Sequence, residues 1–364
     1  MADRVVDIAQ LVNAQILASY WENINRYQDN PNLGASLFPA RRSNNTDLQM
    51  IKGTKGLPVV LQPSEFDTKA PLRDKMGITS LQYGMPFFRE ASQIGEKERQ
   101  ELFKLMNSGE EFVKRFLPMI YDQLTPLIEG AEARMEQMRM SVLSTGAIRV
   151  KASAETGRDV QYDLNFDQDG EWAASNQFEL TGTDTWTEAN AGTNDPIADL
   201  LEIKDQILDE TGHVPTRVLL NSTTLRNMLK SESLKKGMNP LYFESLRFSR
   251  SELQSYVQQE TGLEFIVYDK MFVNDDKETV KYYPDNQITL LPSGAIGSSV
   301  YGVTPEELDL LGASGHAANT SIVNPGIAVT TYREPHPVNI ATIVSMVGAP
   351  SFDRMEEVFV VKVA

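Results

Sequence analysis

The chain has 364 residues, of which 41% are apolar and none is cysteine, and it carries a formal net charge of −16. A chain of this length is expected to form two domains, or one domain with a large excursion, and its apolar content is ample for a sizeable core. The absence of cysteine excludes disulfides, thiolate zinc sites and cysteine nucleophiles. The acidic net charge argues against a protein whose main function is to bind nucleic acid.

The N-terminus predicts a helix rather than a targeting segment. The first residues, MADRVVDIAQ, show no signal-peptide pattern, and no apolar run approaches the roughly 20 residues of a membrane span, so no membrane partner is expected. Asp3 is a candidate cap for a helix that runs to about residues 20–27. Apolar residues recur in it at helical spacing, namely Val5, Ile8, Leu11, Val12, Ile16 and Tyr20. This stripe is expected to dock on the same chain or on a partner.

Residues 51–90 are expected to extend away from the body of the protein and not to form part of its core. Pro58, Pro63, Pro71 and Pro86 block a continuous helix and favour extended geometry before each proline. Short β-prone pieces lie at 59–61 and 78–83, but the segment has too little apolar surface to form a core of its own. It is therefore either a long hairpin held by the body of the protein or an arm held by a neighbouring subunit.

Charge is distributed unevenly along the chain. Residues 41–75 carry seven basic and four acidic side chains, whereas residues 155–210 carry fifteen acidic and two basic ones. Opposed patches on one polypeptide favour copies that attract each other, and the alternative is a solvated surface loop beside an acidic face. The basic candidates for contact between subunits are Lys69, Arg73, Lys75, Arg41 and Arg42.

Helical signals return after Gly95. Residues 108–111 match a Ser-x-x-Glu capping box, and Pro118 limits or kinks that helix. Thr125 and Pro126 predict the start of a second helix that runs to about residue 144 and ends at Gly146. One apolar stripe of this helix holds Leu127, Ala131, Met135 (or Ala133), Met138 and Val142. The methionines are expected in the core, with a methionine-rich binding groove as the alternative.

The remainder of the chain mixes strands and helices. Strands are expected at 148–152 and 160–166, a turn at 167–170, and a polar loop at 186–196. Asp195 and Pro196 predict a helix that runs to Thr211 and ends at Gly212. An α/β block follows, with strands at 216–220 and 263–268, a helix capped by Ser222, and a strand pair at 280–283 and 288–291. Residues 312–326 are expected to form a loop, and 327–332, 338–347 and 358–363 to form antiparallel strands.

No motif for chemistry stands out, so no catalytic, cofactor or metal site is predicted. The three histidines, at 213, 316 and 336, have no metal-ligand spacing, and the phosphate-binding and nucleophile-elbow motifs are absent. Residues 165–170 resemble the start of a calcium-binding EF-hand loop. However, Asn176 stands where the bidentate glutamate belongs, so an acidic turn is expected instead.

The order of these elements, together with several short motifs, resembles the tailed-phage major capsid proteins, specifically the lambda-like major capsid protein E family. The matching residues are Leu33–Pro39 before Met50–Gly53, Trp186–Thr187 before Asn194–Asp199, Tyr282–Ile288 before Gly297–Gly302, and Thr330–Pro335. Each motif is weak alone, but their order and spacing along nearly the whole chain are specific.

The resemblance implies an α+β fold with named parts. These are an N-arm (1–47), an extended β-hairpin loop over an adjacent subunit (48–92), a peripheral domain with a long spine helix and strands (93–194), an α/β axial domain (195–320), and a return to the peripheral domain (321–364). An arm without a core of its own is understandable if a neighbouring copy supplies the surface on which it lies.

The resemblance also implies a function without enzymatic chemistry. The chain is expected to be the major capsid protein of a bacteriophage head, self-assembling as pentamers and hexamers into an icosahedral shell around packaged double-stranded DNA. Assembly through a procapsid in the host cytoplasm, a separate scaffolding protein, a portal protein and an optional decoration protein are expected, with only non-specific proximity to DNA. The alternatives are an encapsulin-like nanocompartment shell that holds a protein cargo, and an acidic soluble enzyme.

Overall fold

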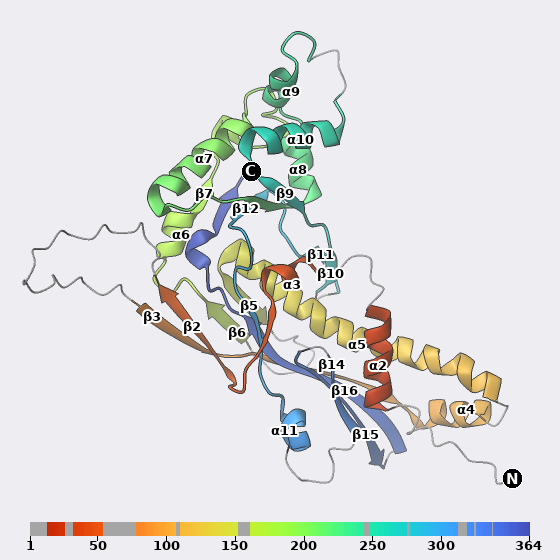
Figure 1. Cartoon of the computed structure of the whole chain (residues 1–364). Coiled ribbons are helices and arrows are strands. Elements are labelled where there is room, and N and C mark those ends of the chain that lie inside the picture. The colour runs from red at the N-terminus through yellow and green to blue at the C-terminus, as the bar shows by residue number, and fades with distance from the viewer. Residues whose placement is uncertain are drawn as a thin grey trace, which may run out of the picture. The chain divides into compact units, whose positions relative to one another are not determined.

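A computed structural model describes residues 13–25, 32–53, 78–106, 110–151, 161–243, 248–274, 277–311, 319–323, 325–336 and 338–364 (Figure 1). The chain divides into two compact units, and both mix helices with strands, which confirms the predicted α+β class. The first unit holds Met1–Leu48, Gln82–Met138 and Ser298–Ser351, and the second holds Gln49–Leu81, Arg139–Gly297 and Phe352–Ala364. In the described part of the chain, no helix has the length and apolar character of a membrane span.

The first unit is built on a six-stranded sheet around one long strand, β16 (Val338–Pro350). Its other strands are β1 (Ala40–Arg42), β4 (Phe87–Ile94), β13 (Ser299–Tyr301), β14 (Thr320–Val323) and β15 (Ile327–Pro335). β16 pairs antiparallel with β15 along one side, and with β4 and then β13 along the other. β1 extends the sheet parallel to β13, and β14 closes the far edge beyond β15. The predicted antiparallel pair at 327–332 and 338–347 is confirmed.

Helix α2 (Ala14–Asn25) packs on β14 and β15 of the same chain. It buries Ala14, Leu17, Ala18 and Trp21, which recur at helical spacing. The predicted stripe is wrong at Ile16, whose side chain is 42% exposed, because the face that meets the sheet is one residue further along the helix. The cap Asp3 lies outside the described residues. Two further helices belong to this unit near the arm, α3 (Leu33–Leu37) and α4 (Glu96–Met106).

Helix α5 runs without a break from Glu110 to Thr145, so the predicted helix start at Thr125 is wrong. Pro126 has no N–H for the carbonyl of Asp122, four residues earlier, which would leave that acceptor unpaired. The Thr125 hydroxyl donates to the Asp122 carbonyl at 3.4 Å. The threonine therefore supplies the donor that Pro126 lacks inside the helix and does not cap a helix start. The methionines Met135 and Met138 are buried with Leu127 and Val142, as predicted for a core stripe.

The second unit is built on a five-stranded sheet in the order β7-β17-β12-β8-β9. The strands are β7 (Gln177–Glu179), β8 (Arg217–Leu220), β9 (Glu264–Val267), β12 (Gln287–Leu291) and β17 (Phe359–Lys362). β8 and β9 are parallel, as are β17 and β7, whereas β12 runs antiparallel to both β8 and β17. The last predicted strand, at 358–363, therefore joins this α/β sheet.

A layer of helices covers one face of this sheet, as Figure 1 shows. It holds α7 (Pro196–Thr211), α8 (Ser222–Met228) and α10 (Arg250–Thr261), and α9 (Glu232–Met238) packs on α7 and α10. Leu200 and Ile203 of α7 and Val257 of α10 pack in one core cluster with Val218 of β8 and Leu290 of β12. The predicted bounds of α7 are confirmed, because Asp195 accepts a hydrogen bond at the start and Gly212 adopts a left-handed conformation at the end.

Polar side chains of β12 face away from that cluster and close the end of α5. The last carbonyls of a helix have no partner within the helix. Thr289 donates to the Leu143 carbonyl at 3.1 Å, and Gln287 donates to the Ser144 carbonyl at 2.8 Å. The buried sheet thus supplies the donors that the end of α5 lacks.

Two-stranded pairs and short elements complete the fold. β2 (Asp47–Gly53) pairs with β3 (Ile78–Gly84), β5 (Ala147–Lys151) with β6 (Gln161–Asn165), and β10 (Met271–Val273) with β11 (Thr279–Lys281). Helix α6 (Glu171–Asn176), the 3₁₀ turns Gly182–Asp184 and Met355–Glu357, and helix α11 (Pro305–Leu311) make up the rest. The predicted strand at 59–61 and the capping serine at 108 lie outside the described residues.

Three further predictions are corrected. Asn221, not Ser222, caps α8, because its side chain accepts from Thr224 N at 2.8 Å. The strands near 280 and 288 do not pair with each other, since β11 pairs with β10 while β12 lies inside the five-stranded sheet. The predicted loop at 312–326 contains strand β14, which pairs with β15. The β-branched residues within Thr320–Val323 favour a strand there.

Gly146 ends α5 as predicted and is sterically indispensable. Its φ is +68°, and a Cβ there would lie 2.7 Å from the ring of Trp172. That buried indole donates from Nε1 to the carbonyl oxygens of Met355 and Val358, at 2.9 and 3.1 Å, so it has little freedom to move away.

We expect Gly146→Ala to lower the free energy of unfolding by about 2–4 kcal/mol, because left-handed strain and overpacking add together. Gly182→Ala is the matched control, since Gly182 also has a positive φ, of +64°, but no atom lies within 4 Å of the position that a Cβ would take there. The control is expected to cost about 1 kcal/mol in urea denaturation of the unassembled chain. Equal losses for both variants would contradict the role of Trp172.

Candidate assembly interface

The segment predicted as the extended arm (48–92) is preceded along the chain by one strand of the first unit's sheet and ends in another. β1 precedes it and β4 ends it, and both strands pair with other strands of that sheet. At the base of the arm the Met85 N–H donates to the Thr46 carbonyl at 2.9 Å, and the Gln82 amide donates to Asp47 at 2.8 Å. The base is therefore a hairpin held by the body of the same chain.

Helix α11 holds the strand at the returning end of the arm. Its Glu306 carboxylate forms an ion pair with Arg89 of β4 and accepts a hydrogen bond from the Ser345 hydroxyl of β16 at 2.8 Å. Arg89 and Ser345 are directly opposite each other in the β4–β16 ladder. One carboxylate thus binds a cross-strand pair, while the Arg89 guanidinium also lies 4.8 Å from the Phe87 ring centroid.

The next residue of α11 holds the strand at the departing end. Glu307 forms an ion pair with Arg42 of β1, and the same guanidinium donates to the Pro325 carbonyl at 2.7 Å. The side chain of Glu307 is only 12% exposed and that of Arg42 33%, so this pair is screened less than a surface pair. Together, Arg42, Arg89, Glu306 and Glu307 form what we term the α11 clamp.

The local sequence explains why both glutamates stand in the first turn of α11. Thr304 precedes the helix and its hydroxyl oxygen accepts from Glu307 N at 3.3 Å, while Pro305 occupies the first helical position. Carboxylates are favoured at a helix N-terminus, where the backbone N–H groups are unpaired. Sequence reasoning missed this clamp, although the Thr-Pro-Glu-Glu string is a helix-start signal that could have revealed the helix.

The structure separates the two neighbouring arginines that were predicted as subunit contacts. Arg42 is engaged within its own chain by Glu307, although every residue of β1, Arg41 included, is exposed to solvent. Successive side chains of a strand point to opposite faces, so Arg41 lies on the face of β1 away from Glu307. Lys69, Arg73 and Lys75 lie outside the described residues. A contact with another subunit stays a prediction for all five basic residues.

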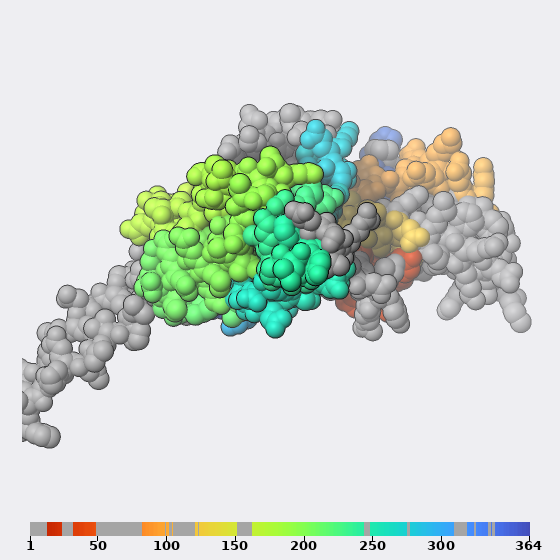
Figure 2. All heavy atoms as spheres, turned by 90° about the horizontal axis from the view of Figure 1, so that it is seen from above, coloured from red at the N-terminus to blue at the C-terminus, as the bar shows by residue number. Residues whose placement is uncertain are grey.

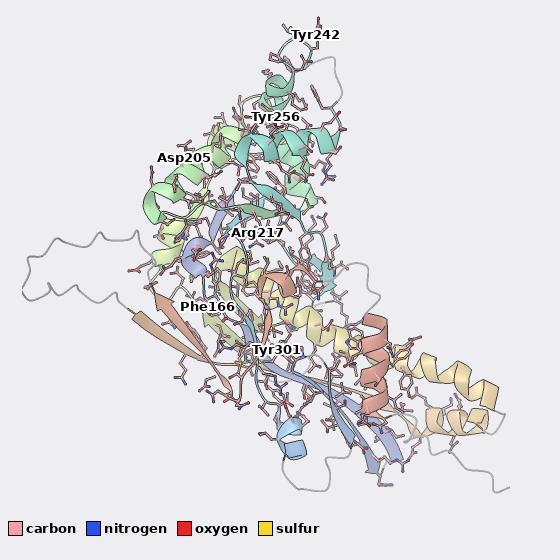
Figure 3. The ribbon with its side chains drawn as sticks, viewed as in Figure 1. Phe166, Asp205, Arg217, Tyr242, Tyr256 and Tyr301 are labelled. Carbon is pink, nitrogen blue, oxygen red and sulfur yellow. The ribbon has the colours of Figure 1, made fainter. Side chains whose placement is uncertain are left out.

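The acidic segment of the sequence divides between structural and exposed positions. Glu202, Asp205 and Asp209 recur along the exposed face of α7, where Figure 3 shows Asp205 on the outer side of the helix. Asp199, one turn earlier, turns inward and accepts from the indole Nε1 of Trp186 at 2.8 Å. Burial, with a smaller contribution from the nearby carboxylates of Asp184 and Asp195, raises the pKa of the Asp199 carboxyl to about 6 against the lowering effect of the Trp186 hydrogen bond.

The carboxylate of the EF-hand-like string has a purely local role. Asp167 accepts from the backbone N–H groups of Trp172 and Ala173, both at 2.9 Å, and so caps α6. Asn176, at the would-be ligand position, donates to the carbonyls of Glu356 and Val358. Within the described ranges, no group of three or more His, Cys, Asp or Glu side chains is arranged to hold a metal ion.

The second unit exposes large apolar side chains beyond α9. Leu241 is 84% exposed and Tyr242 61%, and Figure 3 shows Tyr242 beyond the end of the helical layer, away from the sheet. In the space-filling view the helical layer presents α7 beside α10 (Figure 2). Exposed aromatic and aliphatic residues of this size are typical of protein–protein contacts.

Comparison with known proteins decides between the functional classes. Residues 13–363 match the family model described as phage major capsid protein E. The chain belongs to the phage major capsid protein E family. It is a structural protein of the bacteriophage head shell, and capsid proteins of this kind assemble with copies of themselves. No curated protein matches the chain. The phage family match does not favour the encapsulin-like alternative.

Solved structures show that the chain has the tailed-phage major capsid fold. A prophage capsid protein from E. coli CFT073 has a TM-score of 0.58 at 15% identity, covering 97% of this chain and 99% of that chain. A phage-related protein from Bordetella bronchiseptica RB50 has a TM-score of 0.51 at 12% identity over 96% and 97%. The capsid of cyanophage A-1(L) has a TM-score of 0.50 at 12% identity over 93% and 95%. These likenesses concern the fold alone.

We expect a double-mutant cycle of Arg42→Met and Glu307→Gln to give a coupling energy of about 1–2 kcal/mol in urea unfolding, because the pair is partly buried. The control pair, Arg149 and Asp163, is 3.8 Å apart with side chains 69% and 50% exposed, so its coupling should stay below about 0.5 kcal/mol. Indistinguishable couplings would show that the pair between Arg42 and Glu307 stabilises the fold no more than an exposed pair does.

Asp199 should make stability fall as pH rises. Because the pKa of its carboxyl rises from 3.8 to about 6 on folding, the folded state holds a proton that the unfolded state has released between these values. Asp199→Asn keeps an acceptor for Trp186 and removes the titration. At pH 8 the free energy of unfolding of this variant should be about 1–2 kcal/mol higher than that of the parent. Solvent screening at this half-buried site makes the difference smaller than the change in pKa alone would give. Asp205→Asn, on the exposed face, is the control for the loss of one carboxylate and should not raise the free energy of unfolding at pH 8 in the same way.

Proposed function

We propose that this chain builds an icosahedral shell of pentamers and hexamers that encloses packaged double-stranded DNA. The observation that carries the proposal is the extent of the family match, which runs from 13 to 363 and so includes both units and the arm. Many modest contacts hold such a shell, because each subunit engages several neighbours at once. The net charge of −16 suits a wall that lies near DNA without binding it tightly.

The parts of the subunit take the roles that the family resemblance implies. Residues 1–47 act as the N-arm, 48–92 as the extended loop over a neighbour, 93–194 with 321–351 as the peripheral domain, and 195–320 as the axial domain, whose sheet is completed by β17 of the last residues, 352–364. Exposed Leu241 and Tyr242 support an axial position for their end of the second unit, since copies meeting around an axis would bury them. Scaffolding, portal and decoration proteins are the further partners, with assembly in the host cytoplasm.

The α11 clamp supports the proposed role of the arm. An arm that lies over a neighbouring subunit must leave its own body in a fixed direction, or its tip cannot meet the same surface in every copy. Two ion pairs fix the departing and returning strands at one short helix. We propose that Lys69, Arg73 and Lys75, together with Arg41, then meet acidic surface on the next subunit.

Expression of the chain with and without a scaffolding protein, followed by electron microscopy, tests the shell. Regular hollow particles are expected, and nucleic acid rather than a protein cargo is expected inside mature particles. A uniform monomer or dimer under every condition would contradict self-assembly. An enzyme enclosed in place of DNA would favour the nanocompartment.

Arg73→Glu is expected to impair shell assembly while the isolated subunit stays folded, because it reverses one of the charges of the arm. Arg250→Glu is the matched control, since this exposed arginine begins α10 and lies outside the arm. Particle yield by sedimentation and folding by circular dichroism are the measurements. Normal shells from Arg73→Glu would remove the arm contact from the proposal without affecting the shell itself.

A further inference from the structure

The β10–β11 ribbon presents apolar side chains to solvent in the second unit. Met271 is 55% exposed and Val273 65%, and they share one face of β10 because strand side chains alternate. Phe272, between them, points the other way and stacks on Tyr282 with ring centroids 4.8 Å apart. Tyr282 in turn lies beside Tyr268, which follows β9, with ring centroids 6.2 Å apart, so the aromatic residues join the ribbon to the unit and leave Met271 and Val273 facing outward.

The ribbon also has open strand edges. In the part of the chain that the structure describes, β10 and β11 pair only with each other. A two-stranded ribbon is marginal by itself in water, and unpaired edges beside apolar side chains favour contact with another chain. Met271 and Val273 are termed the ribbon patch, and in the adjoining turn the exposed Lys277 stands beside the exposed Glu278.

A second exposed apolar pair lies at the opposite end of the same sheet. Leu208, in the last turn of α7, is 42% exposed, and Val214, just before β8, is 44% exposed. The exposed acids Asp209 and Glu210 lie beside them. Leu208, Asp209, Glu210 and Val214 are termed the helix-end patch.

Strand direction places the two patches at opposite ends of the unit. β8 and β9 are parallel, so the chain before β8 and the chain after β9 lie at opposite ends of the pair. At one end the Glu264 N–H donates to the Thr216 carbonyl, and at the other the Tyr268 N–H donates to the Leu220 carbonyl, both at 2.9 Å. Val214 precedes the first end and Met271 follows the second.

We infer that the ribbon patch of one copy packs against the helix-end patch of the next copy. Both patches offer two exposed aliphatic side chains, and a capsid protein that assembles with its own copies can bring such patches together. Because the patches differ and lie at opposite ends, each copy can bind one neighbour through each, which makes a head-to-tail contact that closes into a ring. This inference rests on the proposed shell function and names the surfaces that join copies within a ring.

The absence of cysteine from the sequence permits a direct test. Shells are assembled from a chain carrying both Leu208→Cys and Val273→Cys and are treated with a short bis-maleimide. A denaturing gel should then show a ladder of covalent oligomers, because every copy is joined to two neighbours. The matched control carries Val273→Cys with Gln259→Cys on the exposed face of α10, and it should give no ladder.

A charge variant supplies an independent measurement. Val273→Glu directs a carboxylate at the acids of the helix-end patch and should lower particle yield about tenfold, whereas Val273→Lys should be tolerated better. Gln259→Glu adds the same charge elsewhere and should assemble normally. Circular dichroism of the unassembled subunits confirms that each variant is folded.

The outcomes separate the inference from the proposed function. Shells that form without the ladder overturn the head-to-tail pairing, and so do dimers from Val273→Cys alone, which would show a two-fold contact instead. Val273→Glu shells at full yield also overturn it. A parent chain that never assembles overturns the proposed function, and the inference fails with it.

Discussion

Backbone hydrogen bonding along β16 is the constraint on which the first unit depends. This 13-residue strand pairs with β15 on one side and with β4 and β13 in succession on the other. β4, which ends the arm, and β13, which pairs with β1, therefore lie on the same side of β16. Both faces of β16 are buried, with Ile340, Val344 and Met346 on one and Ala341 and Val347 on the other, so a slip by one residue would exchange the packing of the two faces.

Ion pairs add to the backbone hydrogen bonds that hold the strands at the base of the arm. β1 has only three residues and lies at the sheet edge, where few ladder bonds can hold it. The pair between Arg42 and Glu307 adds a side-chain bond at this weak point, and the neighbouring Glu306 does the same for β4 and β16. The position of the arm base thus depends on residues of α11, far from the arm in sequence, rather than on the residues of the arm.

Local signals explain which elements could be predicted. The bounds of α7 follow from Asp195, Pro196 and Gly212, whose effects on the backbone do not depend on the rest of the fold. The continuity of α5 through Pro126 could not be predicted, since it depends on a threonine hydroxyl replacing a missing donor. The partner of β11 was missed because the three-residue strand β10 carries no alternating pattern of useful length.

The candidate interface was predictable only in outline. The basic residues of the arm were visible as a charge imbalance, but the use of Arg42 within its own chain required knowledge that α11 lies beside β1. The same holds for the acidic segment, where Asp167 and Asp199 look like their neighbours in sequence yet cap a helix and bind an indole. Sequence shows how many charges are present, whereas packing decides which remain available to another molecule.

The pairing of β4 with β16 has a mechanical consequence for the head wall. The eight facing residue pairs from Ile94–Ile340 to Phe87–Val347 lie side by side along the strand direction. A pull on the arm along the axis of β4 would therefore load these hydrogen bonds together in shear, instead of opening them one after another as in peeling. Resistance to such a pull is shared across the ladder, so the base of the arm can carry tension.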